Sequence, residues 1–243
     1  GGGGSVSIHA HPLRVAAMAM KRPEALAAVE DLEDKQAVKS FEPIQKAVTA
    51  MEQYRADKEI QKKGVFGLAL ICLTQRRFVF KANALKVVMA AMQSFVQDER
   101  LQADGCEFIR GLCVDDGTQK VMKAGGLQAV VISMTINPES QWVQQEGLGA
   151  LTQFAKREPE IVIQKGGLDT VIRTMENFPR FSWVQMWGCQ ALICFVKATG
   201  PERIQDLRGF EIAEAAMATH EKAEAVQRFG AELLQYKPVK DDD

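Results

Sequence analysis

The stretch Gln144-Gln145-Glu146-Gly147 carries a glycine three residues after a glutamine, and this spacing returns along the chain at a nearly constant interval. The pairs are Gln61/Gly64, Gln102/Gly105, Gln144/Gly147, Gln185/Gly188 and Gln227/Gly230. Successive pairs are separated by 41, 42, 41 and 42 residues. Methionine keeps the same step, at Met51, Met92, Met134, Met175 and Met217. Self-similarity at a period of about 40 residues predicts a stack of equivalent structural units.

Each unit is expected to consist of helices. In the segment 138–157, apolar residues recur at positions i, i+4, i+7, i+8, i+11 and i+12 from Val143, which is the pattern of one helix face. The same pattern fits the segments 101–113 and 184–196. A second helix follows each Gly-Gly pair, at 125–126 and 166–167, and a short helix is predicted near 160–164. A glycine inside a helix costs about 1 kcal/mol relative to alanine, so its recurrence predicts close helix–helix approach.

The stretches 163–175, Ile-Gln-Lys-Gly-Gly-Leu-Asp-Thr-Val-Ile-Arg-Thr-Met, and 142–155, Trp-Val-Gln-Gln-Glu-Gly-Leu-Gly-Ala-Leu-Thr-Gln-Phe-Ala, resemble the armadillo repeat family. The resemblance covers about residues 40–236 and implies an all-α fold, a right-handed α-α superhelix (armadillo-repeat solenoid) of about five repeats. Residues 13–39 are interpreted as an atypical capping repeat within a single domain spanning 13–236. We expect residues 1–12 to be a linker or disordered tail and 237–243 to be a C-terminal tail.

The composition and the reactive residue types give no indication of an enzyme. The net charge of −1 provides no electrostatic attraction to nucleic acid. The five cysteines contain no Cys-x-x-Cys pair and follow the repeat, which predicts buried thiols in a reducing, cytoplasmic setting. The three histidines, His9, His11 and His220, match no zinc-ligand spacing. We therefore expect no catalytic site, no metal and no cofactor.

The resemblance implies that the third helix of each unit, the one with the Gln-x-x-Gly spacing, lines a concave groove. On a helical wheel, the positions five before, one before, two after and six after the glycine lie opposite the apolar face. This outward stripe includes Asp104, Gly111, Gly149 and Cys194. The candidate partner-binding residues on it are Phe66, Glu107, Trp142, Glu146, Gln153, Trp183, Trp187 and Gln190.

All three tryptophans of the chain lie on this stripe in adjacent units, and tryptophan is enriched at binding hot spots. The alternative is that Trp142 and Trp183 pack on loops of the neighbouring unit. Nuclear-import receptors of the family carry a ladder of tryptophan and asparagine in this groove. The tryptophan positions hold Phe66, Glu107, Gly149 and Gln190 here, and binding of nuclear-localisation peptides is not expected.

The leading functional hypothesis is a non-enzymatic scaffold or adaptor, monomeric by itself, that binds a partner peptide or helix in the concave groove. Two alternatives stay open at this point. The chain could be a structural subunit of a larger assembly that packs through its convex face and ends. It could also be a membrane-associated scaffold, if the opening Gly1–Ser5 linker sequence replaces a lipidated N-terminus.

Overall fold

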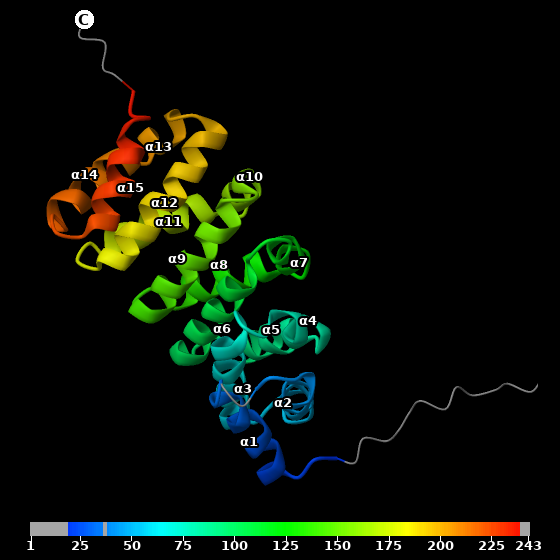
Figure 1. The fold of residues 1–243 in the computed structure, drawn as a ribbon. Coiled ribbons are helices and arrows are strands. Elements are labelled where there is room, and N and C mark those ends of the chain that lie inside the picture. The colour runs from blue at the N-terminus through cyan, green and yellow to red at the C-terminus, as the bar shows by residue number, and fades with distance from the viewer. Residues whose placement is uncertain (1–18, 36–37, 239–243) are drawn as a thin grey trace, which may run out of the picture.

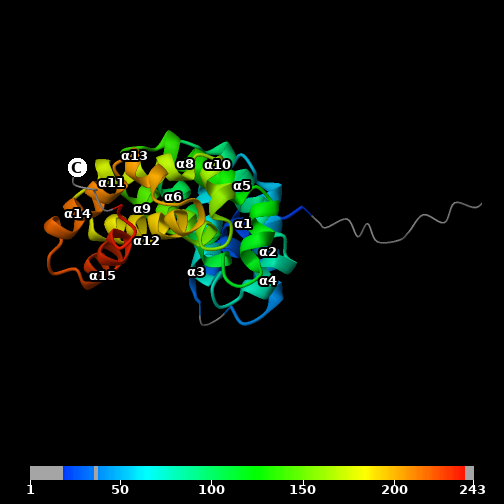
Figure 2. The same cartoon turned by 90° about the horizontal axis from the view of Figure 1, so that it is seen from above.

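The computed structural model describes residues 19–35 and 38–238, and every regular element in these ranges is a helix. The helices form an elongated stack that runs from α1 at one end to α15 at the other (Figure 1). A view from above shows the same order, with the N-terminal and C-terminal helices at opposite ends (Figure 2). The all-α class predicted from the sequence is confirmed, whereas the predicted tail 1–12 lies outside the described residues.

Three kinds of helix alternate along the stack with the period of the sequence repeat. The short first helices are α4 (Arg76–Lys81), α7 (Gly117–Lys123), α10 (Pro159–Gln164) and α13 (Glu202–Asp206). The second helices are α2 (Phe41–Gln53), α5 (Ala84–Ser94), α8 (Gly126–Ile136), α11 (Gly167–Asn177) and α14 (Gly209–Thr219). The third helices are α3 (Lys58–Ile71), α6 (Glu99–Leu112), α9 (Gln141–Ala155), α12 (Ser182–Thr199) and α15 (Glu224–Leu234). The third helices pack on one another in chain order and form a continuous layer.

A left-handed residue separates each first helix from the second helix that follows it. Asn83, Gly125, Gly166 and Arg208 have φ of 56°, 91°, 80° and 58°. They are again 42, 41 and 42 residues apart. Glycine reaches this region without the steric cost that a Cβ imposes, which explains the glycine at two of the four turns.

The repeated glutamine fastens the third helix of a unit to the end of its second helix. In each unit the glutamine Nε2 donates to two carbonyl groups at that end, which have no partner within their own helix. Gln144, for example, donates to Met134 O at 2.7 Å and to Asn137 O at 3.0 Å. The equivalent donors are Gln61, Gln102, Gln185 and Gln227, with distances between 2.7 and 3.1 Å.

The repeated glycine makes room for the repeated methionine. A Cβ placed on Gly147 would lie 2.6 Å from Met134 Sδ, and one on Gly105 would lie 2.6 Å from Met92 Sδ. The remaining three glycines of the series face the methionine of their own unit in the same way. The sequence prediction of close approach is therefore confirmed, and it is a methionine side chain that occupies the space.

The stack begins with α1 (Arg22–Glu30) and the short 3-10 helix η1 (Asp31–Glu33), which pack on α2 and α3. Arg22 bridges Asp57 and Glu59 at 2.6 and 2.7 Å, and Glu30 pairs with Lys63 at 2.7 Å. Ion pairs thus connect α1 and the residues around it to α3 and its N-terminal cap. At the other end, Lys237 pairs with Glu214 of α14 at 2.7 Å.

We predict that Gly147→Ala and Met134→Ala are each destabilising but not additive. The first overpacks the contact and is expected to cost about 1–3 kcal/mol. The second leaves a cavity and is expected to cost about 2–5 kcal/mol. In the double variant the small side chain at 134 accommodates the new Cβ. The loss of unfolding free energy in the double variant should therefore be smaller than the sum of the two single losses by at least about 1 kcal/mol. Urea unfolding of the four proteins measures this coupling, and strict additivity would contradict the contact.

Candidate functional site

The face formed by the third helices is the candidate site, because these helices pack side by side and present equivalent positions in succession. Cross-links between neighbouring helices keep the layer in register. Arg110 of α6 pairs with Glu146 of α9 at 2.9 Å, and Lys197 of α12 pairs with Glu232 of α15 at 2.9 Å. The Thr152 hydroxyl of α9 also donates to Trp187 O of α12 at 3.1 Å.

Three positions of the predicted outward stripe are not outward. Asp104, Gly111 and Gly149 are buried, so their placement on the exposed face was wrong. The third helices α6 and α9, which carry these residues, are each flanked by two others, and side chains from the neighbouring helices cover part of the stripe. Arg110 lies across Gly149, where an added Cβ would approach its Cδ to 2.7 Å, and Cys72 covers Gly111.

The N-terminal half of this face carries charged groups that are already paired. Arg100 hydrogen-bonds Asp104 at 3.0 Å and lies 5.3 Å from the ring centre of Phe66, a predicted groove residue that is half-buried. Glu107 and Glu146, two other predicted residues, are both near Arg110, at 4.0 and 2.9 Å. These neutralised pairs leave little net charge here for a charged ligand.

The C-terminal half differs, because it exposes two tryptophans. Trp142 and Trp183 are 59% and 60% exposed and occupy the same position in α9 and α12. The alternative that they pack on neighbouring loops would require much lower exposure. Ile136 ends α8, and Phe181 precedes α12; both lie at turns between second and third helices and are also exposed. We call Ile136, Trp142, Phe181 and Trp183 the tryptophan edge.

Trp187 is a different kind of residue from the other two tryptophans. It is only partly exposed and packs against the core. The Lys156 ammonium lies 5.9 Å from its ring centre, and burial lowers the pKa of Lys156. Gln153 and Gln190, the remaining predicted residues, are half-buried on α9 and α12, and the side-chain oxygen of Gln190 is buried without a hydrogen-bond partner in the described part of the chain.

The described residues include no group of three or more histidine, cysteine or acidic side chains that could hold a metal ion. The described cysteines are free, and four of them, Cys72, Cys106, Cys113 and Cys189, are buried as predicted. Burial raises the pKa of these four thiols to about 12. Protonated, enclosed thiols are poor nucleophiles and poor metal ligands. Within the described ranges, no helix combines the length and apolar character that crossing a bilayer requires.

The chain matches no protein-family model and no curated protein. Among solved structures it is similar to two crystal structures of engineered proteins from the Northeast Structural Genomics Consortium. One has a TM-score of 0.71 at 21% identity, covering 88% of this chain and 90% of the other. The second has a TM-score of 0.74 at 19% identity, covering 90% and 92%. At this identity the likeness concerns the fold alone.

We predict that the buried carboxyl of Asp104 makes the stability depend on pH. Burial, opposed by the hydrogen bond from Arg100, raises its pKa from the ordinary 3.8 to about 6. The unfolded chain therefore ionises this group more readily, and its contribution to stability is present below pH 4 and lost as the pH rises through about 6. The unfolding free energy of Asp104→Asn should fall less than that of the wild type between pH 4 and 7. If the unfolding free energies of the wild type and of Asp104→Asn changed in parallel with pH, burial would not raise the pKa of this carboxyl.

Proposed function

We propose that the chain is an armadillo-type α-solenoid that acts as a non-enzymatic scaffold or adaptor, holding a protein partner on the face formed by its third helices. The observation that carries this proposal is the pair of equally exposed tryptophans, 59% and 60%, at one position of two neighbouring units. Large apolar side chains left exposed on neighbouring units are typical of interaction surfaces. Tryptophan contributes strongly there, because it buries much area with little loss of side-chain entropy.

The surroundings of the two tryptophans favour an extended peptide or a helix as the partner. The tryptophan edge supplies apolar anchors, while the adjacent face of α9 supplies the half-buried amide of Gln153. Amides can donate to and accept from a peptide backbone. On the N-terminal side of this surface, Arg110 of α6 and Glu146 of α9 pair with each other and are not free to bind a partner. The proposed surface therefore covers the C-terminal units.

The proposal also includes the location of the protein and the absence of catalysis. The free cysteines fit a reducing compartment, and we place the protein in the cytoplasm on that basis. The buried thiols and the neutralised charges on the third-helix face support a role in binding rather than catalysis. Assembly through the ends of the stack is the competing function, which the experiment below distinguishes.

The test is selection of peptides from a displayed library on the purified protein, followed by affinity measurement with variants. Trp142→Ala with Trp183→Ala should weaken binding of the selected peptides by roughly thirtyfold, which corresponds to a loss of about 2 kcal/mol. The melting temperature should change little, because exposed positions affect stability by only about 0.5 kcal/mol. Leu73→Ala is the control, since Leu73 is 65% exposed but lies outside the tryptophan edge.

Equal affinity of the peptides for the wild type and the double tryptophan variant would overturn the proposed site. Loss of binding in the Leu73→Ala control to the same degree would do so as well. Concentration-dependent self-association in sedimentation, abolished by neither change, would favour the assembly subunit instead.

A further inference from the structure

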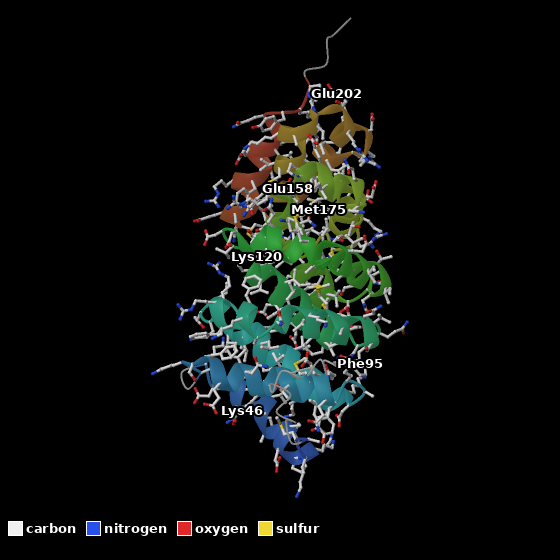
Figure 3. The ribbon with its side chains drawn as sticks, turned by 90° about the vertical axis from the view of Figure 1, so that its right-hand side faces the viewer. Lys46, Phe95, Lys120, Glu158, Met175 and Glu202 are labelled. Atoms are coloured by element: carbon white, nitrogen blue, oxygen red, sulfur yellow. The ribbon has the colours of Figure 1, made fainter. Side chains whose placement is uncertain are left out.

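A cavity of about 820 Å³ lies between the second helices α5 and α8, and none of the four residues of the tryptophan edge lines it. Its walls are mainly apolar and include Phe80, Met89, Ala129 and Ile132. The volume falls within the range of about 300–1,000 Å³ that is usual for sites of small organic ligands. Figure 3 looks onto this side of the molecule, where the labelled Lys120 of α7 marks one border of the cavity.

At one position that lines this cavity, α8 carries a smaller side chain than α5 and α14 carry at the equivalent position. Five residues before the repeated methionine stands Ala129 in α8, but Val87 in α5 and Ile212 in α14. These residues line three of the spaces between neighbouring second helices, of about 820 Å³ at Ala129, 70 Å³ at Val87 and 250 Å³ at Ile212. Ten residues before the methionine, Ala124 lines the cavity; the equivalent residue is Ala82 in the preceding unit and Lys165 and Leu207 in the next two.

The charges around the cavity all have one sign. Lys86 and Lys120 line it, and no aspartate or glutamate does. Lys120 is 2.7 Å from Asp116 and 5.3 Å from the ring centre of Phe80, so it is held at the border. Lys86 is exposed and forms no ion pair with any described residue, so it is available to an anion. An apolar interior with an unpaired ammonium at the mouth is complementary to a molecule with an apolar body and one negative group.

We propose that this cavity binds an aliphatic carboxylic acid of the fatty-acid type, with the chain between α5 and α8 and the carboxylate beside Lys86. The apolar chain is stabilised by leaving water, in proportion to the area that it buries. The ammonium of Lys86 selects for the charged headgroup and contributes less to affinity, because it remains near solvent. This site is independent of the partner surface on the third helices.

Isothermal titration with decanoate and with decanol, each kept below its aggregation concentration, separates the two contributions. The wild type should bind one decanoate per chain. Ala129→Ile, which introduces the side chain found at the same position in α14, should lower the affinity at least about tenfold by filling the cavity. Its melting temperature should not fall. Ala215→Ile, in the smaller space beside α14, is the matched control and should bind decanoate like the wild type.

Lys86→Gln should weaken decanoate about threefold and leave decanol unchanged. Unaltered decanoate affinity in Ala129→Ile would overturn the proposal, as would the absence of saturable binding to the wild type. If Ala129→Ile does not fold, Ala124→Leu fills the same cavity with the residue present at position 207 and must give the same loss. Equal effects of Lys86→Gln on decanoate and decanol would contradict the assignment of a carboxylate.

Discussion

One side-chain amide per unit holds the second and third helices together. Because the last carbonyl groups of a helix have no partner within it, burying that end requires donors from elsewhere. The glutamine supplies two hydrogen bonds from a single group, as Gln144 does to Met134 and Asn137. Gln144 also bonds to the following unit, because its Oε1 accepts a hydrogen bond from the Thr174 hydroxyl of α11 at 2.8 Å. The glycine three residues later lets the methionine fill the remaining space.

This repeated fastening leaves other positions free to differ between units, and the two proposed sites lie at such positions. The residue five before the glycine is Glu59 and Arg100 in the first units, where it forms ion pairs, and Trp142 and Trp183 in the next two, where it is exposed. In the second helices, alanine stands at 129 instead of the larger residues of α5 and α14, and it lines the cavity. Thus the repeated residues account for the stack, and the departures from the repeat account for the candidate sites.

The sequence predicted the helices well because their markers recur with one period. The face of a helix toward solvent was predicted less well. A helical wheel assigns the polar side of an isolated helix, whereas Asp104, Gly111 and Gly149 are covered by neighbouring units. Phe181 and Ile136 were missed because they stand at turns, outside any periodic face. The cavity could not be predicted either, since it depends on the volumes of side chains that face each other across two helices.

The most direct test of this account compares two adjacent glutamines in α9. Gln144 is buried and bonds two carbonyl groups, whereas Gln145 is partly exposed and bonds none of them. Gln144→Leu removes both side-chain hydrogen bonds to these carbonyl groups and leaves the Thr174 hydroxyl without its acceptor, although Asn137 O still accepts from Ser140 N at 3.2 Å. The unfolding free energy of this variant should therefore fall by about 2–4 kcal/mol. Gln145→Leu should change it by about 0.5 kcal/mol at most. Equal, small losses in both variants, measured by urea unfolding, would contradict the claim that the repeated amide holds the units together.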